Sequence, residues 1–149
     1  MSDEYFEPLI IAFCCQYCSY SAADLAGSMR LQYPTNVRII RTPCTGRLEV
    51  EFFMKAFERG ADGILVAGCL EGGCHFSEGN LLAKGRVRYT RSFLSESGLD
   101  ESRIRMVNVS AAGARLLVDH INEMIETVRQ LGPNPLKKTN QSVNQEICV

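Results

Sequence analysis

The sequence predicts an α/β fold built on one parallel sheet, and two observations lead to this prediction. Four short apolar segments are each followed by a longer segment with helical character, and this alternation is typical of a parallel sheet with helices on both faces. The four apolar segments also differ in polarity, which separates central strands from edge strands. The expected strands are residues 9–13, 37–41, 64–67 and 104–109.

The polarity of each strand predicts its place in the sheet. Residues 9–13 (LIIAF) and 64–67 (ILVA) are apolar throughout, so both are expected at the centre, buried on both faces. Residues 37–41 contain two arginines, and residues 104–109 alternate between apolar and polar side chains, so these strands are expected at the edges. The predicted strand order is therefore 2-1-3-4, that of a flavodoxin-like three-layer sandwich.

Helices are expected after each strand, over residues 21–32, 48–59, 78–96 and 112–131. Ser21 can cap the first helix. The second has apolar side chains at i, i+3, i+4 and i+7, which form one buried stripe. The third contains Gly85, which should weaken that helix by up to about 1 kcal/mol relative to alanine.

Composition indicates a soluble globular protein with one domain over residues 1–132 and a polar C-terminal tail over residues 133–149. The chain has 149 residues, 46% of them hydrophobic, and a net charge of −1, which gives no field that would attract nucleic acid. No apolar run approaches the roughly 20 residues of a membrane span. The first ten residues lack the basic cluster of a secretory signal, so a cytoplasmic location is expected.

Six of the seven cysteines directly follow three of the predicted strands. They are Cys14, Cys15 and Cys18, then Cys44, then Cys69 and Cys74. Because the carboxyl ends of neighbouring parallel strands meet at one edge of a sheet, these thiols should converge there. In a reducing compartment, such a pattern favours metal or redox chemistry over structural disulfides.

Five of these cysteines are candidate metal ligands: Cys15, Cys18, Cys44, Cys69 and Cys74. The paired spacings favour Cys15, Cys18, Cys69 and Cys74 as a set of four, with Cys44 as the one left out. Side chains alternate along a strand, so Cys14 should point away from Cys15 and into the core. Neither Cys148 in the tail nor His120 on a helix is expected to ligate. His75 is expected to donate a hydrogen bond near the site.

Converging thiolates suit either an iron–sulfur cluster or a zinc ion. A chain of this length does not need a structural zinc to fold, which favours the cluster. Two alternatives stay open: a dithiol oxidoreductase that uses Cys15-x-x-Cys18, and a zinc-stabilised docking module. No base, oxyanion hole or phosphate loop indicates an organic substrate, so no catalytic residue is expected.

Several motifs together resemble one protein family. They are Phe13-Cys14-Cys15-Gln16-Tyr17-Cys18-Ser19-Tyr20, Pro43-Cys44-Thr45-Gly46-Arg47, Val66-Ala67-Gly68-Cys69, Gly72-Gly73-Cys74-His75 and Glu78-Gly79-Asn80. These motifs resemble the delta subunit family of methyl-viologen-reducing hydrogenases, over about residues 9–131. One departure is Gln16-Tyr17, where many relatives have Asn-Trp.

The resemblance implies a [2Fe–2S] cluster held by four of the five candidate cysteines. It also implies an electron relay within an anaerobic multi-subunit complex. The donor would be a hydrogenase, a formate dehydrogenase or another electron-donor subunit, and the acceptor would be a flavin-containing heterodisulfide reductase A-like subunit. The basic segment with Lys84, Arg86, Arg88 and Arg91 is then either a docking face for a partner or a solvated helix surface.

Overall fold

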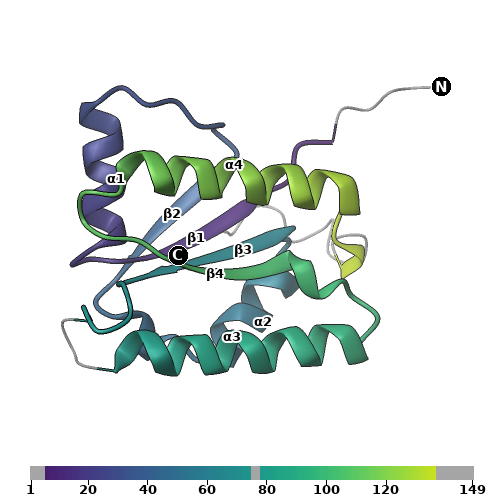
Figure 1. Ribbon diagram of the computed structural model, residues 1–149. Helices are drawn as coiled ribbons and strands as arrows, with labels where there is room; N and C mark the ends of the chain where they lie inside the picture. Colours follow the sequence, from purple (N-terminus) through teal and green to yellow (C-terminus); the bar gives the residue numbers. More distant parts are fainter. Residues whose placement is uncertain (1–5, 75–77, 137–149) are drawn as a thin grey trace.

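A computed structural model describes residues 6–74 and 78–136, and these form a three-layer α/β sandwich (Figure 1). The strands are β1 (Ile10–Cys15), β2 (Val37–Thr42), β3 (Gly63–Gly68) and β4 (Ile104–Asn108). The helices are α1 (Ser19–Ser28), α2 (Val50–Glu58), α3 (Gly79–Glu96) and α4 (Ala114–Leu131). The sheet is parallel with the order β2-β1-β3-β4, which confirms the predicted fold class and strand order.

Burial along the strands follows the polarity of their sequences. Every residue of β1 and β3 is buried, whereas β2 and β4 expose part of their length to solvent. In the register of the sheet, Cys15 lies opposite Thr42, and Cys14 lies opposite Ala67 of β3. The carboxyl ends of the strands are therefore aligned, and the segments that follow them leave the sheet at the same edge.

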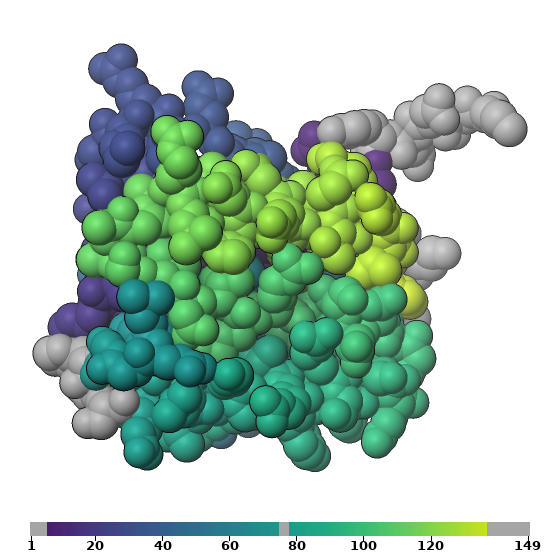
Figure 2. All heavy atoms as spheres, viewed as in Figure 1, coloured from purple at the N-terminus to yellow at the C-terminus, as the bar shows by residue number. Residues whose placement is uncertain are grey.

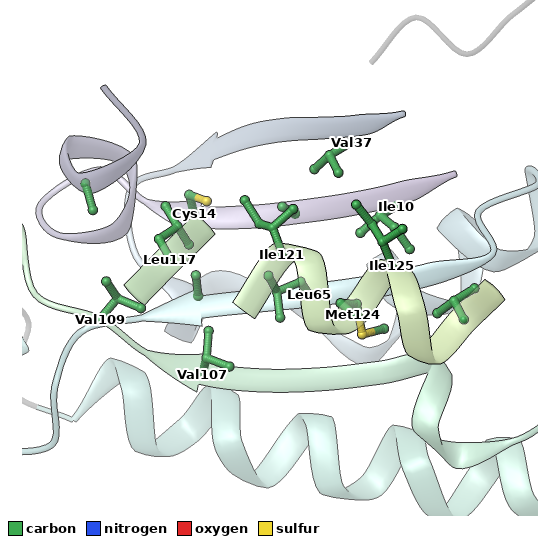
Figure 3. Close-up of a cluster of buried hydrophobic side chains, with 14 residues drawn as sticks. Ile10, Cys14, Val37, Leu65, Val107, Val109, Leu117, Ile121, Met124 and Ile125 are labelled. Carbon is green, nitrogen blue, oxygen red and sulfur yellow. The ribbon is translucent and has the colours of Figure 1, made fainter. Parts of the chain in front are cut away.

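Two apolar cores flank the sheet, one under each pair of helices. Helices α1 and α4 cover one face, where side chains of the sheet pack against Leu117, Ile121 and Ile125 of α4 (Figure 3). On the opposite face, α2 and α3 pack over a second core that contains Phe53 and Phe57. Both cores consist of ordinary apolar side chains, so neither depends on a metal ion for its packing.

Helix α1 begins and ends earlier than its sequence predicts. It starts at Ser19 with Cys18 at the N-cap position, so the prediction that Ser21 caps it is wrong. The Ser19 hydroxyl donates a 2.6 Å hydrogen bond to the carbonyl of Ala67 on β3, which ties the first turn of the helix to the sheet. The helix ends at Ser28, and Arg30 follows in a left-handed conformation with φ 57°.

The described chain continues past α4 and packs against the opposite end of the sheet. Asn134 is fully buried, and its amide donates hydrogen bonds of 2.9 and 2.8 Å to the carbonyls of Phe57 and Ala61. Asp62 accepts from the backbone N–H groups of Leu9 and Asn134. Most of the predicted tail, from residue 137 onward, lies outside the described residues.

None of the helices in the described part of the chain is both long and apolar enough to cross a membrane.

Candidate metal centre

Three cysteines from two neighbouring strands meet at the carboxyl edge of the sheet. Cys15 is the last residue of β1, Cys18 precedes α1, and Cys69 directly follows β3. Their three sulfur atoms all lie within 4.8 Å of one another, and the Sγ atoms of Cys15 and Cys69 are 3.6 Å apart. All three side chains are buried, so the thiols form a compact pocket shielded from water.

The other two candidate cysteines lie beside this pocket. Cys74 is half-buried and packs against the group of three, from the loop that follows β3. Cys44 begins the short 3₁₀ helix η1 (Thr45–Arg47), and its Sγ accepts a 3.4 Å hydrogen bond from the backbone N–H of Gly46. The Cys44 and Cys74 thiols also interact with each other. Figure 2 shows the loop of residues 69–74 at the molecular surface, next to the first turn of α3.

Cys14 lies on the other side of β1, as expected from the alternation of side chains along a strand. It is fully buried in the core beneath α4, next to Leu117 (Figure 3). Burial raises the pKa of its thiol to about 12, so it stays protonated at neutral pH. The expectation that Cys14 is a core residue is therefore confirmed.

Cys148, His75 and His120 are the remaining residues considered from the sequence. Cys148 and His75 lie outside the described residues, so the roles expected for them stay predictions. His120 is half-buried on α4, where its Nδ1 lies 3.8 Å from a carboxylate oxygen of Glu123.

Hydrogen bonds among the thiols shift their pKa values in opposite directions. The Cys18 thiol donates to the sulfur of Cys15 and lowers the pKa of Cys15 to about 5, with further help from the backbone N–H of Tyr17. The same interaction raises the pKa of Cys18, and burial raises the pKa of Cys44. Thiolate ligation therefore requires that metal binding displaces the protons that Cys18 and Cys44 hold in the metal-free pocket.

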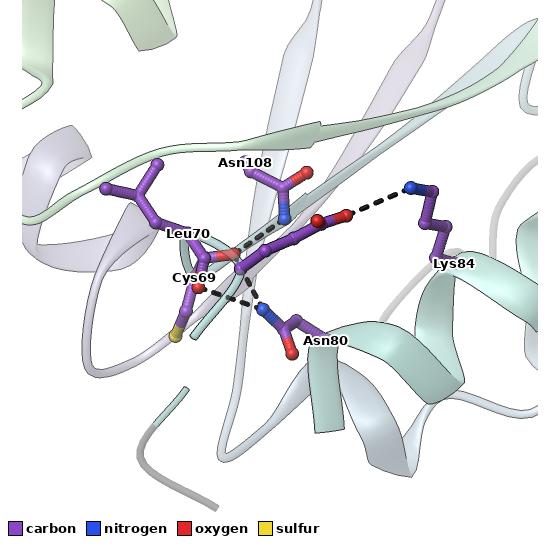
Figure 4. Close-up of polar contacts among 6 residues, drawn as sticks. Cys69, Leu70, Asn80, Lys84 and Asn108 are labelled. Carbon is purple, nitrogen blue, oxygen red and sulfur yellow. Dashed lines mark hydrogen bonds and ion pairs between the residues drawn. The ribbon is translucent and has the colours of Figure 1, made fainter. Parts of the chain in front are cut away.

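Two asparagines hold the backbone at Cys69, and neither was expected from the sequence to belong to the site. The side-chain amide of Asn80 on α3 donates to the carbonyls of Cys69 and Leu70, at 3.1 and 3.0 Å (Figure 4). Asn108, the last residue of β4, donates a 2.6 Å hydrogen bond to the same Cys69 carbonyl. The sequence nevertheless indicated both residues. Asn108 ends the fourth strand at the edge of the sheet where the cysteines lie, and Asn80 belongs to the Glu78-Gly79-Asn80 motif.

Gly46 and Gly79 both lie beside the sulfur of Cys44. A Cβ atom added to Gly79 would overlap the sulfur of Cys44 and would lie 3.4 Å from that of Cys74. Only a glycine leaves this space open next to two thiols. Soft thiolate donors in such a cradle fit an iron–sulfur cluster, and the same donors suit zinc.

The basic segment of α3 does not act as one surface. The Arg86 guanidinium donates to the backbone carbonyls of Gly46 and Leu48, so it supports the chain after Cys44. By contrast, Lys84, Arg88 and Arg91 line a groove of about 320 Å³ between α3 and β4. Arg86 therefore supports the chain after Cys44, and whether the basic segment is a docking face or a solvated helix surface stays a prediction.

Sequence comparison with known proteins identifies a family for this chain. Residues 10–132 match the family model described as methyl-viologen-reducing hydrogenase, delta subunit. The vhu iron-sulfur subunit of the F420-non-reducing hydrogenase from Methanocaldococcus jannaschii is 49% identical over 131 residues, which cover 88% of this chain and 98% of the relative. The corresponding protein from Methanococcus voltae is 46% identical over 132 residues, which cover 89% and 98%.

A relative of a different kind is a much longer protein. It is the large A component of the ferredoxin/F(420)H(2)-dependent CoB-CoM heterodisulfide reductase of Methanosarcina acetivorans. It is 44% identical over 126 residues, which cover 85% of this chain but 16% of that protein. The family match spans the whole sandwich and all five candidate cysteines. The chain therefore belongs to the delta subunit family of methyl-viologen-reducing hydrogenases.

Proposed function

We propose that this chain is an electron-relay subunit that holds a [2Fe–2S] cluster in its cysteine pocket. The observation that supports this most strongly is the buried group of Cys15, Cys18 and Cys69, whose sulfurs lie within 4.8 Å of one another. Two further thiols adjoin it, and thiolate ligation is what such clusters require. When bound, the cluster takes up and releases one electron at a time.

For the ligands we propose Cys15, Cys18, Cys69 and Cys74, with Cys44 as the fifth, non-ligating thiol. Cys74 packs directly against the group of three. Cys44 is not part of this packed group, and its sulfur accepts a hydrogen bond from the Gly46 N–H. Absorption and electron paramagnetic resonance spectra of the five single Cys→Ser variants test this assignment. The Cys44→Ser variant should keep the wild-type spectrum, and the other four should lose or alter it.

The relatives suggest the partners on either side of the relay. Several are named as iron-sulfur subunits of hydrogenases, which is consistent with a hydrogenase as electron donor. In two Methanosarcina proteins the matching region is part of a longer heterodisulfide reductase component, in one continuous chain. Where the two parts are separate chains, a binding surface has to replace that covalent link. We therefore propose that the acceptor is a flavin-containing heterodisulfide reductase A-like subunit.

The complex is proposed to be cytoplasmic and to work under anaerobic conditions. The alternative donor is a formate dehydrogenase or another electron-donor subunit. Mixing the purified proteins tests the relay directly. Flavin reduction in the A-like subunit by the reduced donor should require this chain, and the Cys15→Ser variant should not support it.

A dithiol oxidoreductase is the second candidate, because the pKa of Cys15 is lowered to about 5 and its sulfur contacts Cys18. The third thiol at 3.6 Å, that of Cys69, favours a metal centre instead. Metal analysis after anaerobic purification separates the candidates. The relay predicts iron and acid-labile sulfide in equal amounts and a paramagnetic signal after reduction. Zinc without iron would support a docking module, and metal-free protein would support the dithiol.

A further inference from the structure

Helix α3 begins directly against two of the candidate thiols. Its first residue is Gly79. The side-chain atoms nearest to the position that a Cβ would take at this residue are the sulfurs of Cys44 and Cys74. A Cβ added to Gly46 would lie 2.7 Å from the Cα and 2.9 Å from the carbonyl oxygen of Gly79. The two glycines are thus in backbone-to-backbone contact, and no other residue type allows so close an approach.

Arg86 holds this contact together from two turns further along α3. Its guanidinium donates to the carbonyl of Gly46 and, at 3.2 Å, to that of Leu48. It also lies 3.5 Å from the carboxylate of Glu49, with 27% of its side chain exposed. Both carbonyls accept from Nη1, while Nη2 is the nitrogen that lies near Glu49. The planar guanidinium therefore binds the two carbonyls and the carboxylate at once through two nitrogens, whereas a lysine has only one.

We propose that Gly79 and Arg86 are positioning residues that fix the N-terminus of α3 against the sulfurs of Cys44 and Cys74, and that this contact raises the reduction potential of the centre. The inference rests on the proposed function. A helix N-terminus carries a partial positive charge, here from a helix of 18 residues. Reduction adds one negative charge beside it, so a close helix N-terminus stabilises the reduced form more than the oxidised form.

A redox titration of the loaded protein tests the role of Gly79. In Gly79→Ala, the new methyl group has to push α3 away from the sulfur of Cys44. Reduction should then become about tenfold less favourable, which corresponds to a midpoint potential about 59 mV lower for one electron. Gly85→Ala is the matched control, because a Cβ at this position of the same helix meets no atom within 4 Å. Its potential should equal that of the wild type.

A second pair of variants tests the same idea without adding a methyl group at the site. Arg86→Lys keeps the charge but replaces two guanidinium nitrogens by one ammonium nitrogen, so it cannot keep the carbonyl contacts and the Glu49 contact together. The hold on the chain after Cys44 should weaken, and the potential should fall in the same direction. Arg88→Lys is its control, since Arg88 is exposed on the same helix. If Gly79→Ala does not retain the cluster, the Arg86→Lys and Arg88→Lys pair decides the question.

The possible outcomes separate this inference from the proposed function. A wild-type protein that binds no iron contradicts the proposed function itself. A loaded wild-type protein whose potential is unchanged in both Gly79→Ala and Arg86→Lys leaves the relay intact and overturns the positioning role. A lower potential in these variants, with both controls unchanged, supports it.

Discussion

At the scale of single residues, Cys14 and Cys15 are adjacent in the chain but chemically different. Cys14 faces the apolar core and keeps its proton, because burial raises its pKa to about 12. Cys15 faces the pocket, where hydrogen bonds from neighbouring thiols lower its pKa to about 5. The difference follows from side-chain alternation in a strand, which turns successive residues to opposite faces of the sheet.

This contrast leads to a prediction about metal content. Cys14→Ala should lower the free energy of unfolding by about 1 kcal/mol, because it removes a buried sulfur from the core, and should leave the iron content unchanged. Cys15→Ala, one residue along, should lose the iron. Denaturant unfolding and iron analysis of the two variants check this. Loss of iron in Cys14→Ala without loss of structure would assign Cys14 to the site.

Asn134 is a second residue whose environment leads to a prediction. Its amide binds two backbone carbonyls in a fully buried position. Asn134→Ala should lower the free energy of unfolding by about 2–3 kcal/mol, since it leaves the carbonyls of Phe57 and Ala61 without this donor. Asn122→Ala, at an exposed position of α4, should change it by less than about 0.5 kcal/mol. If urea unfolding showed the same loss of stability for both variants, the buried hydrogen bonds of Asn134 would not be the cause.

At the scale of secondary-structure elements, α3 does more than cover one face of the sheet. Its first turn supplies Gly79 beside two thiols and Asn80 beneath the Cys69 carbonyl, and Arg86 holds the chain after Cys44. Further along, Lys84, Arg88 and Arg91 line the groove next to β4. One helix therefore connects the cysteine pocket with this groove.

The glycines in and after α3 should respond to substitution in opposite directions. Gly85 lies inside the helix with open space around it, so Gly85→Ala should stabilise the protein by up to about 1 kcal/mol. Gly98 follows the helix with φ +84°, where a side chain is strained, so Gly98→Ala should destabilise it by about 1–2 kcal/mol. Thermal unfolding of both variants measures the signs, and two changes in the same direction would contradict this explanation.

At the scale of the whole molecule, the cysteine pocket lies at one end of a sheet whose two faces are packed independently of it. The cores beneath α4 and beneath α2 and α3 are apolar and contain none of the five candidate ligands. The fold should therefore form without a metal, unlike a zinc finger, which is unfolded in its absence.

Removal of the metal should thus lower stability without unfolding the protein. After chelation under reducing conditions, the far-ultraviolet circular dichroism should stay close to that of the loaded protein, while the melting temperature falls because the metal binds only the folded state. An unfolded apoprotein would contradict this and would show that the metal is required for folding.

Much of this architecture can be inferred from the sequence. Strand order follows from the polarity of residues 9–13 and 64–67 relative to the other two strands, because a strand at the centre of a parallel sheet is buried on both faces. The convergence of the cysteines follows in turn, since parallel strands place their carboxyl ends at one edge. The exclusion of Cys14 needs no more than the alternation of side chains.

The contacts around the pocket required the folded chain. Asn80, Asn108 and Arg86 reach carbonyls between 10 and 40 positions away in the sequence. The start of α1 depends on a hydrogen bond from Ser19 to Ala67, across 48 positions. Periodicity and capping patterns describe neighbours along the chain. The proximity of Cys44, Gly79 and Cys74 depends instead on how loops and helices pack, which no local pattern encodes.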